Sequence, residues 1–396
     1  MPEVDVHAMT QWRHAIHRHP ELGFEEVRTS RLVAQCLRDW GYDVVTGLAE
    51  TGLVGTLVFG DGGGPRLGLR AEMDALPIDE ATGLPWASEV PGKMHGCGHD
   101  GHTTMLLGAA QALAKLHGLR GTLHLVFQPA EEVGGGGGAQ RMIEQGLFER
   151  FPVDAIFAMH NLPGAPQGRF LFREGPFMAS SDRATLVFEG TGGHGAMPHL
   201  AADPTIAAAS TVMALQSIVA RNVDPLASAV ITVGRLEAGR TYNVIPETAE
   251  LELSVRALAP DVRDLLEQRI RAVAEGQARS FGLTCRVHYE RGYPVLVNAQ
   301  EPTRLAREVA QEHFGHALVT PHAAPLCASE DFAYMLQERP GSYVFIGNGD
   351  NGHATGQPCG PCSVHNPHYD FDDRNLRPGA SFWVALARKF LSSSGS

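Results

Sequence analysis

Hydrophobic and polar positions over the first 180 residues alternate between short β-rich runs and helical patterns. This alternation is typical of an α/β domain with a largely parallel sheet. Residues 10–40 are expected to form helices, the second of them following Pro20 in a first turn. The remaining predicted elements are strands 54–59, 66–70, 122–127 and 155–159 and helices 102–116 and 140–148.

The pattern changes over residues 181–292. Strand 183–189, helix 204–221, strands 229–236 and 247–257, helix 261–281 and strand 283–289 follow one another. This β-α-β-β-α-β order predicts a ferredoxin-like domain. Helix–strand alternation then resumes, with helices 301–314, 330–337 and 378–391 and strand 342–346. We therefore expect a larger α/β domain formed by 1–180 and 293–396, with a small domain, 181–292, inserted into it.

Composition narrows the possible partners and compartment. The net charge of −12 argues against nucleic acid or an anionic membrane as a partner. The longest apolar run, 206–220, is too short and too polar to cross a bilayer. No basic start followed by an apolar stretch is visible, and six cysteines in so long a chain do not form a disulfide framework. These features predict a cytoplasmic protein with reduced thiols.

Groups with metal-binding or acid–base chemistry follow several predicted strands, and the chain contains 19 histidines. In open α/β sheets, ligands bind beyond the carboxyl ends of the strands. The residues expected at that edge are Glu72 and Asp74, Glu131 and Glu132, and His160, with Cys97 and His99 just before a helix. The sequence therefore predicts that they gather on one rim of the sheet.

Cys97 and His99 are the first metal-ligand candidates. Residues two apart in an extended segment point the same way, so both can reach one ion. A thiolate and an imidazole suit zinc or another first-row divalent ion. A glycine-rich helix entry with incidental polar groups is the alternative for a single Cys-x-His. The histidines and acids predicted nearby favour the metal site.

Glu131 and Glu132 follow an apolar strand and precede five glycines. Adjacent carboxylates can divide their roles, one binding a metal and the other accepting a proton from the attacking water. A solvated turn is the alternative interpretation of the two glutamates.

Asp74 could orient a ligand imidazole or cap a helix or turn. His160 and His365 are weak candidates alone, because a lone histidine is more often structural.

The inserted domain contains three further candidates. His194 lies in a glycine-lined loop, from which an imidazole can donate a hydrogen bond to a developing oxyanion. Asn243 and Arg256 follow, and an arginine can bind a substrate carboxylate through paired hydrogen bonds. Arg256 as a surface strand residue is the alternative. Cys359 and Cys362 have the spacing of a redox or zinc half-site, but no second pair accompanies them, so we interpret them as a loop feature.

Taken together, nine segments resemble one known family almost from end to end. They are RHAIHRHPELGFEE (13–26), LRAEMDALPIDE (69–80), MHGCGHDGHTTMLLGAA (94–110), FQPAEE (127–132), AMHN (158–161), GGHGAMPH (192–199), NVIPE (243–247), SEDF (329–332) and VHNPHYDF (364–371). With them the chain resembles the N-acyl-amino-acid amidohydrolases. This branch of the aminoacylase-type metallopeptidases includes hippurate hydrolase and the plant indole-acetyl-amino-acid hydrolases.

The resemblance implies a catalytic α/β domain of the zinc-exopeptidase type and an inserted domain that dimerises and acts as a lid. It implies two divalent metal ions per subunit, Mn, Zn, Ni or Co, held by Cys97, His99, Glu132, His160 and His365, with Cys97 bridging. Glu131 would be the general base and acid, and Asp74 the supporting carboxylate. His194 would reach the active site of the partner subunit. Glu72 departs from the aspartate expected there and should lie beside the site.

The implied reaction is hydrolysis of a small N-acyl amino acid to a carboxylic acid and a free amino acid. His194, Asn243 and Arg256 would bind this substrate. A homodimer is expected, with a homotetramer as the alternative. Two other functions stay open: a metallo-dipeptidase or aminopeptidase acting on free amines, and a catalytically silent ligand-binding paralogue. His95 and His102 are expected to pack against their neighbours or to support the metal ligands. Asp100 is expected to orient a neighbouring side chain or to cap the next helix.

Overall fold

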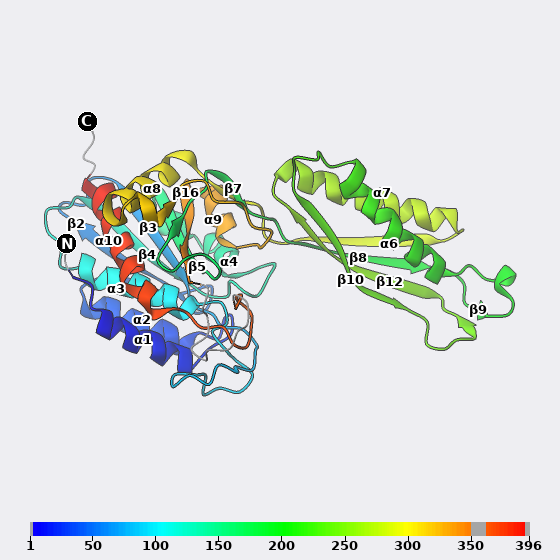
Figure 1. The fold of residues 1–396 in the computed structure, drawn as a ribbon, viewed down its shortest axis with the longest axis horizontal. Coiled ribbons are helices and arrows are strands. Elements are labelled where there is room, and N and C mark those ends of the chain that lie inside the picture. The colour runs from blue at the N-terminus through cyan, green and yellow to red at the C-terminus, as the bar shows by residue number, and fades with distance from the viewer. Residues whose placement is uncertain (1–2, 350–361, 393–396) are drawn as a thin grey trace. The chain divides into compact units, whose positions relative to one another are not determined.

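The computed structural model describes residues 3–349 and 362–392, which form two compact units. Unit 1 comprises residues 1–175, 297–324 and 331–396, and unit 2 comprises residues 176–296 and 325–330. Unit 2 therefore extends a few residues beyond 181–292 at each end and takes in a short later segment. Each unit is described by itself (Figure 1).

Unit 1 is built on a mixed eight-stranded sheet in the order β1-β2-β4-β3-β5-β16-β6-β15. Its strands are β1 (Asp43–Leu48), β2 (Gly52–Phe59), β3 (Arg66–Glu72), β4 (Gly121–Gln128), β5 (Ala155–Leu162), β6 (Phe170–Leu171), β15 (Val319–Thr320) and β16 (Gly341–Gly347). The four central strands, β4, β3, β5 and β16, are parallel, whereas β1, β2 and β6 run antiparallel to their inner neighbours. The largely parallel sheet predicted from the pattern therefore holds at the centre only. A three-residue connection, 49–51, joins β1 to β2 and permits only an antiparallel pair.

Helices cover this sheet. They are α1 (Val6–Arg18), α2 (Val27–Asp39), α3 (His99–Leu113), α4 (Gly138–Glu144), α5 (Leu147–Arg150), α8 (Gln300–Phe314), α9 (Phe332–Glu338) and α10 (Leu376–Ser392). Nearly every residue of α3 is buried. Its small residues permit this, because a Cβ on Gly108 would meet the Met9 sulfur of α1 at 2.4 Å. On α10, a Cβ on Gly379 would similarly overlap Met105 of α3. Close helix packing thus places the start of α3 inside unit 1.

Three local predictions need correction. The helix expected soon after Pro20 begins only at Val27, because residues 19–26 form a turn and an isolated bridge to Ala75. The helix expected from residue 102 already begins at His99. His160, expected just after a strand, lies within β5, where it pairs with Phe345 of β16.

Unit 2 follows the order β8 (Asp182–Glu189), α6 (Pro204–Arg221), β10 (Ala229–Ala238), β12 (Thr248–Ala257), α7 (Pro260–Ser280) and β13 (Thr284–Arg291). The four strands form one antiparallel sheet in the order β10-β12-β8-β13. Alternate residues of β12 are buried against a core shared with α6 and α7. A separate short pair, β9 (Gly193–His194) with β11 (Val244–Ile245), adjoins this sheet.

The remaining elements are short: β7 (Gly175–Met178), β14 (Leu296–Asn298) and the 3-10 helices Pro198–Leu200, His316–Leu318 and Asp373–Asn375. Among the described residues, no helix has the length and apolar character needed to cross a membrane. Cys36, Cys97, Cys285 and Cys327 are free thiols.

A buried ion pair closes one end of the unit 2 sheet. The Asp182 carboxylate, at the start of β8, accepts hydrogen bonds from Arg263 Nε at 2.9 Å and from the Tyr289 hydroxyl at 2.9 Å. It also accepts one from the Gly292 backbone N–H at 3.2 Å. Asp182 therefore joins β8, α7 and the end of β13.

Asp182→Ala should lower the free energy of unfolding of unit 2 by about 3–5 kcal/mol, because it leaves the Arg263 charge buried and unpaired. Urea denaturation of the full chain checks this. The matched control is Arg183→Ala, which breaks an exposed pair with Glu252 and should change the same quantity by less than about 1 kcal/mol. Equal effects of the two substitutions would contradict the prediction.

Candidate metal centre and active site

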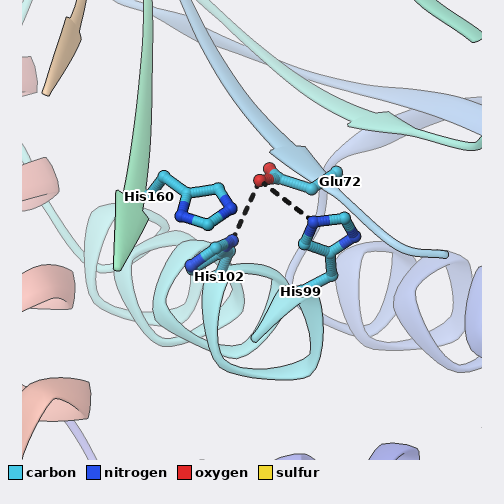
Figure 2. Close-up of side chains that lie close together, drawn as sticks. All are labelled: Glu72, His99, His102 and His160. Atoms are coloured by element: carbon cyan, nitrogen blue, oxygen red, sulfur yellow. Dashed lines mark hydrogen bonds and ion pairs between the residues drawn. The ribbon is translucent and has the colours of Figure 1, made fainter. Parts of the chain in front are cut away.

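Four buried side chains meet below the central strands of unit 1. Figure 2 shows Glu72 from β3, His160 from β5 and His99 and His102 from α3 pointing toward one another. One ligand-type atom of each lies within 4.8 Å of the others. Glu72, which we expected beside the site, is thus a member of this buried group.

Hydrogen bonds within the group already occupy His102 and Glu72. His102 Nδ1 donates to Glu72 Oε1 at 2.9 Å, and its Nε2 accepts from the Asn161 backbone N–H at 2.9 Å. Glu72 Oε2 accepts from Arg70 Nη1 at 2.9 Å. Burial alone would raise the pKa of Glu72, but the charges of Arg70 and His102 hold it well below its usual value. Both nitrogens of His102 are therefore in use, so it supports its neighbours.

A second group consists of Cys97, His99 and Glu132. One ligand-type atom of each lies within 4.8 Å of the others. His99 Nδ1 donates to the Asp74 carbonyl at 2.8 Å, while its buried Nε2 has no hydrogen-bond partner among the described residues and lies 3.8 Å from Glu72 Oε1. Glu132 Oε1 is buried as well, and His365 Nε2 lies 2.9 Å from it. Ligand-type atoms gathered in this way fit a shared cation.

The fourth and fifth candidate ligands join the same set. Cys97 Sγ lies 3.3 Å from His160 Nε2, and His160 Nδ1 donates to the Asn161 carbonyl at 2.7 Å, which leaves Nε2 as the acceptor. The structure therefore brings together Cys97, His99, Glu132, His160 and His365. Sulfur, imidazole and carboxylate donors of this kind fit zinc, manganese, cobalt or nickel.

The charge environment also fits a cation. Burial raises the pKa of the Cys97 thiol well above its usual value, and the charges of Glu132 and Glu131 raise it further. Burial alone would lower the pKa of His99, but its bond to Asp74 and the charge of Glu72 raise it to about 10. Surroundings negative enough to hold a proton on His99 equally favour a metal cation there.

Cys97 and His99 reach one point by a route different from the one expected. The segment is not extended: Gly98 has a left-handed φ of 91° and precedes the first residue of α3. A Cβ on Gly98 would meet Asn161 Nδ2 at 2.4 Å and the Tyr369 hydroxyl at 2.5 Å. A tight glycine turn therefore aims both side chains at the centre.

A buried ionic network anchors the first turn of α3. Asp100 Oδ2 accepts hydrogen bonds from His17 Nδ1 at 2.8 Å and from Arg13 Nη1 at 3.2 Å, and all three side chains are fully buried. Burial alone would raise the pKa of Asp100, but the charges of His17 and Arg13 hold it far below its usual range. Asp100 thus orients the two neighbours on α1.

Two carboxylates position the loop that contains Glu131 and Glu132. Asp74 Oδ2 accepts the Glu132 backbone N–H at 2.8 Å, while its Oδ1 lies 3.2 Å from His99 Nδ1. Glu26 Oε1 accepts the Ala130 backbone N–H at 2.8 Å. Near this loop, a carboxylate oxygen of Asp331 lies within 4.8 Å of a carboxylate oxygen of Glu131.

The candidates in unit 2 lie at opposite ends of its sheet. His194 is exposed on β9 opposite Val244, and the Asn243 carbonyl accepts the Gly195 N–H at 2.9 Å. Arg256 lies near the other end of β12, half-buried, and donates to the Ser329 hydroxyl at 2.9 Å. Burial lowers the pKa of Arg256, and no carboxylate bonds to it among the described residues. Figure 1 shows β9 beyond the end of the strands.

Glu26 and Asp331 were not predicted from the sequence, and Glu72 was expected at the same sheet edge but beside the metal site. All three fall within the segments 13–26, 69–80 and 329–332 that carried the family resemblance. An acid that is fully buried in a chain of this size needs partners, but burial of a given acid is not visible in the sequence. Cys359 lies outside the described residues, and Cys362 is buried.

The stability of the chain should depend on pH through Glu26. Burial and the nearby charge of Asp74 raise the pKa of Glu26 from 4.5 to about 7. Between these values the folded chain keeps a proton that the unfolded chain has lost. The free energy of unfolding relative to Glu26→Gln should therefore fall by up to about 3 kcal/mol as pH rises from about 4.5 to 7.

Denaturant unfolding of both proteins at matched metal content, across this pH range, checks the prediction. Glu25→Gln, at an exposed acid one position away, is the control and should show no such trend against wild type. A constant difference between wild type and Glu26→Gln at every pH would contradict it.

Comparison with known proteins agrees with this geometry. The family model described as Peptidase family M20/M25/M40 matches residues 68–389. Hippurate hydrolase of Campylobacter jejuni is 43% identical over 96% of this chain and 95% of its own length. N-acetyl-L-cysteine deacetylase of Bacillus subtilis is 39% identical, covering 96% of this chain and 88% of its own. A dinuclear metal-binding M20 peptidase from Bacillus subtilis superposes with a TM-score of 0.84 at 32% identity, covering 98% of this chain and 99% of that one. The family resemblance is confirmed: this chain is a hydrolase that belongs to peptidase family M20/M25/M40.

Proposed function

We propose that the protein is a two-metal amidohydrolase that cleaves N-acyl amino acids to a carboxylic acid and a free amino acid. The observation that carries this proposal is the grouping of Cys97, His99 and Glu132, whose ligand-type atoms lie within 4.8 Å of one another, with Cys97 at 3.3 Å from His160 and Glu132 at 2.9 Å from His365. The names of the relatives, a hippurate hydrolase and an N-acetylcysteine deacetylase, support this substrate class.

The proposed ligands are Cys97, His99, Glu132, His160 and His365, with Cys97 bridging. Divalent ions bound there would acidify water and polarise the amide carbonyl. Asp74 would hold His99 as a neutral ligand by accepting from Nδ1, and it would hold the Glu132 backbone at the same time. Manganese, zinc, nickel and cobalt all fit these donors.

Glu131 is the proposed proton carrier. It is nearly buried, at 6% exposure, and belongs to the same loop as the proposed ligand Glu132. Its carboxylate would take a proton from the attacking water as the new C–O bond forms. It would then deliver that proton to the leaving amide nitrogen as the C–N bond breaks, so that the free amine departs neutral.

Arg256, Asn243 and His194 are the proposed substrate contacts. Arg256 is half-buried, and no carboxylate within residues 3–349 and 362–392 bonds to it, which suits paired hydrogen bonds to the free acid of the substrate. His194 and Asn243 lie beyond the Thr248 end of β12. Along this strand Thr248 is about 27 Å from Arg256, at about 3.4 Å per residue. One small substrate cannot touch both ends of one chain, so we propose that His194 acts in the active site of a partner subunit.

A homodimer is the smallest assembly that allows this, and a homotetramer would allow it as well. The separation of His194 from Arg256 within one chain supports an assembly of this kind. The cytoplasmic location remains a prediction from the sequence.

Glu131→Gln should reduce kcat for N-benzoylglycine by about 10²–10⁴-fold, because the amide cannot carry the proton. Metal analysis should still find the wild-type ion content, because Glu131 is not among the proposed ligands. Glu144→Gln, at an exposed acid on α4, is the control. Retention of more than about a tenth of wild-type turnover would exclude Glu131 as the proton carrier.

A mixture of Glu131→Gln and His194→Ala subunits tests the partner contribution. Each variant alone should be inactive, but a mixed dimer contains one site with an intact Glu131 and an intact His194. After subunit exchange at equal amounts, about a quarter of wild-type activity should return. No recovery, with exchange shown by differently tagged subunits, would place His194 in its own chain's site or outside catalysis.

Paired assays with N-benzoylglycine and an unblocked dipeptide identify the substrate class. We expect turnover of the blocked substrate to exceed that of the dipeptide, because the proposed site offers only a carboxylate-binding group. The opposite preference would indicate a dipeptidase or aminopeptidase. Inactivity on both after adding Mn²⁺, Zn²⁺, Co²⁺ or Ni²⁺ would indicate a silent ligand-binding protein.

A further inference from the structure

The backbone N–H groups of the two residues that flank Glu131 are held by buried carboxylates from distant parts of the chain. The Ala130 N–H donates to Glu26 Oε1 at 2.8 Å, and the Glu132 N–H donates to Asp74 Oδ2 at 2.8 Å. Glu26 and Asp74 come from the start of α2 and the end of β3. The proposed general base therefore lies between two fixed peptides.

The residue before Glu131 has a backbone conformation that needs external support. Ala130 has a φ of 54°, a left-handed value that residues with a Cβ rarely adopt and that persists only where the surroundings impose it. Ala130 is fully buried, and its carbonyl accepts the Gly138 N–H at 3.0 Å. A Cβ on Gly23 would approach Ala130 Cα at 3.0 Å, so the turn before α2 packs directly on this peptide.

Glu26 has no competing structural role at the helix it precedes. It is the N-cap residue of α2, but its side chain makes no capping bond there. Glu21 accepts from the Arg28 and Thr29 backbone N–H groups instead. The fully buried Glu26 carboxylate instead bonds Ala130 and accepts the Thr51 hydroxyl at 2.5 Å. Its carboxylate therefore joins the loop of Glu131 to the connection between β1 and β2.

We infer that Glu26 is a positioning residue for catalysis. By accepting the Ala130 N–H, it holds Ala130 in its left-handed conformation and so orients the Glu131 carboxylate. This inference rests on the proposed function, because it takes Glu131 as the base. It predicts that loss of the acceptor oxygen reduces kcat without weakening substrate or metal binding. A misplacement of about 1 Å in a reacting group can reduce a rate about 10²-fold.

The test compares Glu26→Met, which removes the acceptor at similar volume, with Glu26→Gln, whose amide oxygen can still accept the Ala130 N–H. Steady-state kinetics on N-benzoylglycine and metal analysis are measured for both, with Glu25→Gln as the control at an exposed acid. Glu26→Met should reduce kcat by about 10–100-fold with KM within about threefold and the wild-type ion content. Glu26→Gln and Glu25→Gln should stay within about threefold of wild type.

A folded Glu26→Met protein with wild-type ion content and kcat within about twofold of wild type would overturn the inference, as would equal losses in Glu26→Met and Glu26→Gln. If Glu26→Met does not fold, Glu26→Asp keeps a carboxylate but is one methylene shorter, which withdraws its oxygen from the Ala130 N–H. A decrease in kcat of about two- to fivefold with unchanged KM then supports the inference, and unchanged kcat overturns it. A metal-loaded wild type that hydrolyses no N-acyl amino acid would instead overturn the proposed function, and this inference with it.

Discussion

A single buried carboxylate, Asp74, connects the two segments on which the centre depends. One oxygen lies against His99 at the start of α3, and the other accepts the Glu132 backbone N–H after β4. These segments are far apart in the sequence, so their spacing is set by this shared contact and by the parallel pairing of β3 with β4. The ligand-type atoms of His99 and Glu132 lie within 4.8 Å of each other, and Asp74 holds both the His99 ring and the Glu132 backbone.

The cost of burying so many charged groups is met by their mutual pairing. Glu72 is balanced by Arg70 and His102, and Asp100 by His17 and Arg13. Each of these pairs is almost completely buried, where a single unpaired charge would be strongly unfavourable. In contrast, the buried His99 Nε2 has no hydrogen-bond partner among the described residues, and Cys97 and Glu132 contact only other candidate ligands, His160 and His365. The network thus satisfies the supporting groups and leaves the candidate ligands in contact with one another, where a cation could bind them.

Proton transfer and substrate recognition are assigned to different units of the chain. The proposed proton carrier and ligands all belong to unit 1, whereas His194, Asn243 and Arg256 belong to unit 2. Within unit 2, antiparallel pairing places His194 and Arg256 at opposite ends of β12. A rigid sheet cannot bring them together, so the proposed arrangement depends on a second copy of the chain.

The order of the longer helices and strands, apart from β1, and the identity of the candidate donors were predicted from the sequence alone. Hydrophobic periodicity determines which face of an element is buried, and the strand-end rule singled out Asp74, Glu131 and Glu132. Only the tertiary structure decided how these groups are used. The left-handed Gly98 turn, the Glu72–His102 pair and the contact of Glu26 with Ala130 join residues with no local pattern in common. Such contacts depend on the packing of distant segments, which periodicity along the chain does not encode.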